Sequence, residues 1–250
     1  SHLSNSDIIG GAGIAAYRIH KALLKKGINS KLFVNNYYSG DLTVIPPKNK
    51  IGKINSILKP RIINPLKKLL VTENKALHSL SVLPSNWPKK LNNSDVDLVH
   101  LHWIQNEMIS IKNIGEIKKP VLMNTHDMWA FSGAEHLSFG KRWEEGYLKN
   151  NRPYDESGYD LNRYIWKLKK RYWVKPFHIV SPSRWMAECV KNSALMKNWQ
   201  CEVIPNCIDT EKWRPFRYDI SHKGHVLRNT VHKIKDPHNL EKVTRIFFSH

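Results

Sequence analysis

Short apolar runs alternate along the chain with longer stretches of helical periodicity. Residues 1–5 have the pattern of a strand. Apolar side chains then recur at near-helical spacing through residues 13–27, and Gly27 is typical of a helix end. The alternation continues with predicted strands at residues 30–34, 95–103, 118–127, 177–183 and 201–206 and a predicted helix at residues 184–195. This order is typical of an α/β fold with a parallel sheet and helices on both faces.

Four segments of this pattern follow predicted strands directly. In an open parallel sheet, ligands bind beyond the carboxyl ends of the strands, so residues that follow the strands meet at one edge. The segments are SDIIGGAG at residues 6–13, HLHW at 100–103, NTHDMW at 124–129 and SPSRW at 181–185. Their convergence predicts a ligand site at this edge.

The first of these segments contains a glycine-rich loop. Residues 11–16 fit the pattern G-x-G-x-x-A between a strand and a helix, where the backbone can approach a phosphate and the helix supplies N–H groups. A dinucleotide site would also need an acidic residue at the end of the second strand, and Asn35 and Asn36 stand there. The loop therefore favours a phosphate of another ligand, with a purely structural turn as the alternative.

The histidines are the next candidates for chemistry. His100 and His102 alternate along one predicted strand and so face the same side, while His126 ends the next strand and is followed by Asp127. A single histidine is more often structural than catalytic. A zinc site built from His100, His102, His126 and His136 matches no closed-site spacing. A Ser-His-Asp hydrolase is disfavoured because no G-x-S-x-G elbow is present.

Composition limits the classes of protein. The 250 residues suffice for one large or two small domains, and 41% are hydrophobic, which predicts a folded core. No apolar run is long enough to span a membrane, and no signal peptide is visible. Three cysteines without C-x-x-C spacing predict reduced thiols in a cytosolic protein.

The formal net charge of +19 is unevenly distributed. Residues 48–90 contain ten Lys or Arg and one acid, Glu73, and helices are predicted there around Arg61–Leu70 and Glu73–Leu80. A second basic cluster at residues 162–177 is interleaved with aromatic residues. Such clusters attract the phosphates of nucleic acid, anionic lipid or a sugar nucleotide. The alternative is a solvated surface whose aromatic stems pack inward.

Five segments together resemble a known family. Residues 6–34, 97–103, 124–136, 179–195 and 203–216 are similar, in collinear order, to the N-terminal half of a bacterial family 4 glycosyltransferase of the colanic-acid or O-antigen type. The resemblance implies a GT-B architecture, in which two Rossmann-like domains face each other across a cleft. It also implies retaining transfer of a sugar from a nucleotide-sugar donor to a glycan or lipid-linked acceptor in surface polysaccharide biosynthesis.

The resemblance further implies that the enzyme needs no metal or other cofactor. It implies a cytoplasmic protein, peripheral on the inner membrane face, whose acceptor binds mainly to the N-terminal domain. The family roles, carried over onto matching residues only, place Gly10, Gly11 and Gly13 against the donor diphosphate, His126 at the reaction centre, His102, Asp127, Trp129, Glu135 and His136 around the acceptor, Ser183 and Arg184 on the cleft rim, and Asn206 at the hinge.

Departures from the family pattern occur near the end of the chain. Cys207 stands where many relatives have glycine, and no E-x7-E element follows. We expect residues 1–206 to form the N-terminal domain, 207–216 an interdomain linker, and 217–250 an aberrant or truncated tail. Such a chain alone is expected to be inactive. The alternative function is a non-catalytic binding module for phosphorylated glycan, anionic lipid or nucleic acid, although no nucleic-acid motif accompanies the charge.

Overall fold

The structure, a computed structural model, describes residues 1–47 and 50–210, without the side chain of Ile51. Residues 1–208 form one compact unit. The tail expected at 217–250 and most of the linker expected at 207–216 lie outside the described residues. All three cysteines are free thiols.

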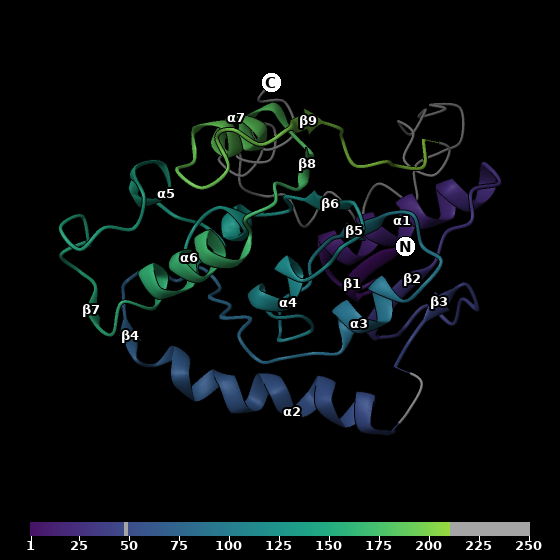
Figure 1. Ribbon diagram of the computed structural model, residues 1–250, viewed down its shortest axis with the longest axis horizontal. Helices are drawn as coiled ribbons and strands as arrows, with labels where there is room; N and C mark the ends of the chain where they lie inside the picture. The colour runs from purple at the N-terminus through teal and green to yellow at the C-terminus, as the bar shows by residue number, and fades with distance from the viewer. Residues whose placement is uncertain (48–49, 211–250) are drawn as a thin grey trace, which may run out of the picture. The chain divides into compact units, whose positions relative to one another are not determined.

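Seven strands of the described chain form one sheet in the order β3-β2-β1-β5-β6-β8-β9 (Figure 1). Every neighbouring pair in this sheet is parallel, which confirms the α/β Rossmann-like fold class. The strands are β1 (His2–Ser6), β2 (Leu32–Asn36), β3 (Val44–Ile45), β5 (Val99–Leu101), β6 (Val121–Asn124), β8 (His178–Ser181) and β9 (Cys201–Val203). The chain order reverses between β1 and β5, so the carboxyl ends of these two strands open at a topological switch point.

Helices pack on both faces of the sheet. On one face, Ala16 of the first helix packs with Leu32 and Val34 of β2. On the other face, Phe33 belongs to the main core, which contains residues of the later helices. The helices are α1 (Gly10–Lys25), α2 (Lys50–Lys67), α3 (Trp87–Asn92), α4 (Ile111–Gly115), α5 (Arg142–Glu145), α6 (Leu161–Tyr172) and α7 (Arg184–Asn192), with a 3₁₀ turn, η1 (Met128–Ala130). The first helix ends as predicted, because Gly27 has a φ of +74°, a conformation that favours glycine.

The segment between β3 and β5 differs from the prediction. The helix expected around Arg61–Leu70 is α2, which begins earlier and contains two prolines, and it lies along the lower edge of Figure 1. The helix expected at Glu73–Leu80 is absent from the described structure. After β4 (Leu70–Val71), which pairs with β7 (Ser157–Gly158), this segment instead follows residues 134–136. The backbone N–H of Ser79 donates to the carbonyl oxygen of Ala134 at 2.8 Å. These long-range hydrogen bonds override local helix propensity.

The second basic cluster contains both exposed and buried side chains, and Lys167, Lys170, Arg171 and Lys175 are exposed. Lys169 of α6 is fully buried, and its ammonium donates to the carbonyl oxygens of Trp129, Ser132 and Gly133. The indoles of Trp166 and Trp173 are also buried. The inward-packing alternative is therefore correct for these residues, which hold α6 against residues 129–133.

Candidate functional site

A cavity of about 520 Å³ lies at the carboxyl ends of β1, β2, β5 and β6. Residues 4–6 and 9–13 form one wall. Asn36 and Tyr38 lie beyond β2, Trp103 and Asn106 beyond β5, and His126 and Asp127 beyond β6. Three of the four segments predicted to meet at this edge therefore line one cavity.

The glycine loop forms the wall at the start of α1. Gly10 has a φ of +74°, which favours glycine, and a Cβ on Gly13 would lie 2.9 Å from the carbonyl oxygen of Ser6. A Cβ on Gly11 would meet nothing within 4 Å. No side chain caps the helix at Ile9, and the first turn contains no acid. The first-turn N–H groups have no partner within the helix, so they and the helix dipole favour an anion in the cavity.

Asp7 holds this loop in place through hydrogen bonds to backbone N–H groups. Its buried carboxylate accepts hydrogen bonds from the backbone N–H groups of Ile8 at 2.9 Å, Tyr38 at 3.1 Å and Ser39 at 2.9 Å. Burial acts to raise the pKa of Asp7, but these hydrogen bonds outweigh it and lower the pKa. The ionised carboxylate therefore ties the start of α1 to the segment after β2 and sets the shape of the cavity.

His126 faces this cavity at the end of a chain of imidazoles. Its Nε2 lies 3.2 Å from Nδ1 of His102, and Nε2 of His102 lies 3.2 Å from Nδ1 of His2. Burial lowers the pKa of His126 to about 4, although the nearby Asp127 acts in the opposite direction. Near pH 7 His126 is therefore neutral and acts through hydrogen bonds. His102 is buried behind it and does not line the 520 Å³ cavity.

Asp127 is held by three donors. Its Oδ1 accepts from the backbone N–H of Trp129 at 3.0 Å, and its Oδ2 accepts from Nε1 of Trp103 at 3.2 Å. Nδ1 of His136 lies 2.6 Å from the same Oδ2, and Nε2 of His136 lies 2.9 Å from the hydroxyl of Ser79. His136 thus supports Asp127 from the interior, and Asp127 presents a fixed acceptor beside His126.

Trp129 and Glu135, assigned to the acceptor pocket by resemblance, are buried and do not line the 520 Å³ cavity. Trp129 is 1% exposed, and its Nε1 donates to the carbonyl oxygen of Ser79 at 2.9 Å. Glu135 is 2% exposed and accepts a hydrogen bond from the hydroxyl of Tyr147. In this structure both residues hold the loop that carries His126 and Asp127.

Three further assigned residues lie outside the cavity. Ser183 caps α7, since its hydroxyl accepts from the backbone N–H of Met186 at 3.2 Å, and Arg184 is exposed at the first position of the helix. Both follow β8 at the same sheet edge, but neither lines the cavity. Asn206 is exposed beyond β9. Their assigned roles stay predictions.

The cavity also contains residues that the sequence interpretation did not select. Asn36, which disfavours a dinucleotide site in the sequence, lines the wall with Tyr38. Asn106 has a φ of 56°, and this left-handed turn places it at the cavity. No sequence motif marks Asn106, whereas Tyr38 could have been selected because it follows the end of β2.

A larger groove of about 640 Å³ lies elsewhere on the molecule. It is lined by the second half of α1 and by residues near the amino ends of β1, β2 and β5, among them Ser1, Lys31 and Leu98. Size alone would favour this groove as the ligand site. We favour the smaller cavity because it combines strand carboxyl ends with a helix N-terminus and converging polar side chains.

A family model described as Glycosyltransferase Family 4 matches residues 9–212. The chain belongs to glycosyltransferase family 4. The match begins within the glycine loop and includes His126 and Asp127. All residues that line the 520 Å³ cavity, apart from residues 4–6, therefore lie in the family 4 region. A search of curated proteins and a search of solved structures found no match.

Proposed function

We propose that the 520 Å³ cavity binds a nucleotide-sugar donor beside an acceptor hydroxyl, and that the chain takes part in sugar transfer with retention at the anomeric carbon. The observation that supports this most directly is the position of the α1 N-terminus and His126 on one cavity in a family 4 chain. The acceptor class is a glycan or lipid-linked glycan of the surface polysaccharide type, as colanic-acid and O-antigen acceptors are.

The proposed chemistry follows from where charge develops. Breaking the bond between the anomeric carbon and the donor leaves negative charge on the departing diphosphate. The N–H groups at the start of α1 lie at one wall and stabilise that charge without a metal or other cofactor. His126 is neutral and hydrogen-bonds a hydroxyl of the transferred sugar, while the carboxylate of Asp127 accepts from a hydroxyl of the sugar ligands.

Gly11→Ala tests where the donor lies. The added Cβ points into open space of the empty protein, so the fold is expected to remain and α1 to gain up to about 1 kcal/mol of helix propensity. If a diphosphate lies against the loop, the same methyl group displaces it. We expect the affinity for the preferred nucleotide sugar to fall at least 10-fold, as measured by calorimetry over a panel of UDP-, GDP-, ADP- and dTDP-linked sugars.

Gly140→Ala is the matched control, because its Cβ also meets nothing within 4 Å and the residue lies outside the cavity. It should leave affinity unchanged. Equal affinity in wild type and Gly11→Ala would contradict the proposed donor position. Binding of a phosphorylated glycan, anionic lipid or nucleic acid, with no nucleotide sugar bound, would favour the non-catalytic module instead.

We also propose that α2 docks on an anionic membrane surface, which would place the protein peripherally on the inner face. No helix of residues 1–47 and 50–210 has the length and apolar character to cross a membrane. Among the described side chains of α2, Ile63 is buried, whereas the large apolar side chains that are exposed are Ile54, Ile57, Leu58, Ile62 and Leu66.

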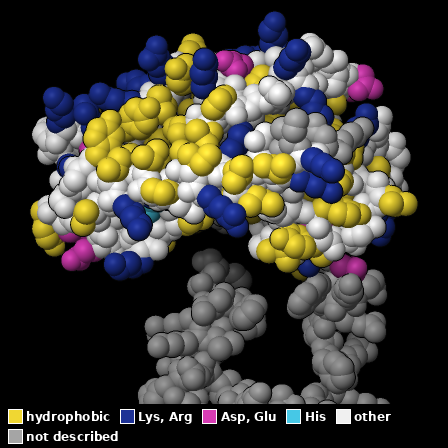
Figure 2. All heavy atoms as spheres, turned by 90° about the horizontal axis from the view of Figure 1, so that it is seen from below, with side chains coloured by type: hydrophobic (Ala, Val, Ile, Leu, Met, Phe, Trp, Pro, Cys, Tyr) yellow, Lys and Arg dark blue, Asp and Glu magenta, His cyan; other side chains and the backbone are white. Residues whose placement is uncertain are grey.

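The exposed side chains of α2 match an interfacial helix. Ile54, Leu58 and Ile62 are spaced four residues apart and form one ridge. Figure 2 views the side that carries α2 and shows apolar side chains gathered on it among Lys and Arg. Lys53 and Arg61 of this helix are exposed. An apolar ridge bordered by cations fits a surface of anionic headgroups over acyl chains.

Leu58→Glu combined with Ile62→Glu is expected to weaken binding to anionic liposomes more than 10-fold. Each apolar side chain buried in the membrane contributes roughly 1.5–3 kcal/mol, and the new charges repel the headgroups. Flotation of wild type and variant with anionic and neutral liposomes measures this. Leu42→Glu, at a fully exposed loop position, is the control. Equal flotation with neutral liposomes, or unchanged flotation of the double variant, would contradict the docking surface.

A further inference from the structure

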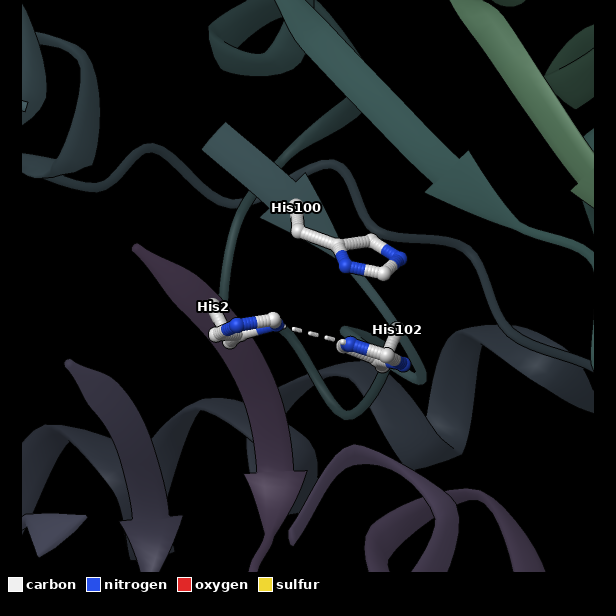
Figure 3. Close-up of side chains that lie close together, drawn as sticks. All are labelled: His2, His100 and His102. Atoms are coloured by element: carbon white, nitrogen blue, oxygen red, sulfur yellow. Dashed lines mark hydrogen bonds between the residues drawn. The ribbon is translucent and has the colours of Figure 1, made fainter. Parts of the chain in front are cut away.

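Three imidazoles gather behind the candidate site on one face of the sheet (Figure 3). His2 belongs to β1 and pairs in register with His100 of β5, and His102 follows two residues later on the same face. The ring centroids of His100 and His102 lie 4.0 Å apart, and those of His2 and His100 lie 4.9 Å apart. One ring nitrogen from each residue lies within 4.8 Å of the other two.

The environment favours neutral rings. All three side chains are buried, and burial is the largest cause that lowers the pKa of each. The pKa of His2 falls to about 2 and that of His100 to about 4. A metal ion binds the deprotonated imidazole, so protons do not compete with it here near neutral pH.

We propose that His2, His100 and His102 bind one Zn²⁺ ion or another divalent transition metal that prefers imidazole. Zinc bonds histidine nitrogen at about 2.0–2.1 Å, and tetrahedral geometry then places neighbouring ligand nitrogens about 3.3 Å apart. Nδ1 of His2 and Nε2 of His102 lie 3.2 Å apart. One nitrogen of His100 lies within 4.8 Å of those that the other two rings offer, so these separations must shorten by about 1.5 Å at most to complete three bonds.

The second nitrogens of two of these rings are already held by neighbours. Nε2 of His100 lies 3.1 Å from the side-chain oxygen of Asn124, and Nδ1 of His102 lies 3.2 Å from Nε2 of His126. Partners of this kind orient metal-binding histidines and fix their tautomers. In Figure 3 the remaining nitrogen of His100 faces the other two rings. The pattern leaves Nδ1 of His2, Nδ1 of His100 and Nε2 of His102 for the metal.

The site also has an entry path and room for a fourth ligand. His2 and His100 line the 640 Å³ groove, so an ion and a water molecule can reach them from that side. A metal on Nε2 of His102 leaves the proton on its Nδ1, which then donates to Nε2 of His126. His126 is thereby fixed as a donor through its own Nδ1–H. The competing explanation is a chain of neutral histidines that hydrogen-bond one another without metal.

Co²⁺ and Zn²⁺ titrations of the EDTA-treated chain test the site. We expect wild type to bind one equivalent more than His100→Asn, with the intense visible bands of four-coordinate Co²⁺. Zn²⁺ should raise the melting temperature of wild type but not that of His100→Asn. The control His178→Ala, whose ring contacts Gln200 and Glu202 away from the cluster, should behave as wild type. The chain has 13 histidines, and others can also bind metal. The test is therefore the difference in bound metal equivalents between wild type and His100→Asn, not the total bound by either.

Nuclear magnetic resonance of the ring nitrogens decides the matter if His100→Asn does not fold. Zn²⁺ must shift the ring signals of His2, His100 and His102 in wild type. It must leave those of His78, whose Nδ1 lies 2.8 Å from the carbonyl oxygen of Ala76, unchanged. Equal stoichiometry and spectra in wild type and a folded His100→Asn, or unshifted ring signals, would overturn the proposal.

Discussion

Replacing His126 by alanine is expected to lower the rate of sugar transfer by roughly 10²–10³-fold, the usual effect of removing one positioned contact to a transition state. The neutral ring loses its hydrogen bond to the transferred sugar, while the cavity keeps its glycine loop and Asp127. The rate should be measured with the protein expressed from its complete gene, together with its preferred nucleotide sugar. The affinity for that donor should change much less than the rate, because the diphosphate contacts remain.

His178→Ala serves as the control for this variant. His178 is the first residue of β8, at the amino end of the strand, and its Nε2 lies 3.0 Å from Glu202. Its replacement therefore leaves the cavity at the carboxyl ends of the strands intact. Thermal melting must show that both variants are folded. A folded His126→Ala protein that transfers sugar at the wild-type rate would show that His126 has no part in the reaction.

Replacing Lys169 by methionine is expected to destabilise the domain by at least about 3 kcal/mol. Methionine fills the same space, but it leaves the carbonyl oxygens of Trp129, Ser132 and Gly133 without their buried donor, at about 1–3 kcal/mol each. Burial lowers the pKa of Lys169 well below its usual range, so burying the ammonium itself costs stability, and Glu135 and Asp127 reduce this cost. The three hydrogen bonds must outweigh it. For a chain of this size the melting temperature should fall by about 6–12 °C.

Lys167→Met, two residues away on the exposed side of α6, should change the melting temperature little. Urea unfolding of both variants compares their free energies directly. If the two substitutions had equal effects, the hydrogen bonds of Lys169 would contribute no net stability, and residues 129–133 would need another source of order.

The sheet and its carboxyl edge could be predicted from the sequence because periodicity reports them directly. Most of the buried strands are apolar runs, and parallel order follows from their alternation with helices. The exceptions are β1, whose sequence HLSNS has one apolar residue, and the two-residue β3, which was not predicted. The glycine loop, His126 and Asp127 therefore converge on one cavity as expected from strand ends alone. The order of the strands also predicts that Ser183 lies at that edge, but it does not predict that Ser183 lies outside the cavity.

Other features depend on contacts that no local pattern encodes. Glu135 and Trp129 are polar or amphipathic residues in a loop, and only packing against Tyr147 and Ser79 turns them inward. In the sequence Lys169 cannot be told apart from the other cations of its cluster. The carbonyl oxygens to which it donates lie 36–40 positions earlier in the chain. The cluster of His2, His100 and His102 required the order of β1 and β5 in the sheet, which alternation leaves open.

Hydrogen–deuterium exchange with and without the preferred nucleotide sugar tests the central claim most directly, because it locates the ligand without assuming activity. We predict that the donor slows exchange of the amides of residues 10–13 and of His126 and Asp127. The walls of the 640 Å³ groove, such as residues 28–31, should exchange as before. Protection confined to that groove, with the glycine loop unaffected, would contradict the assignment of the carboxyl-edge cavity as the sugar-nucleotide site.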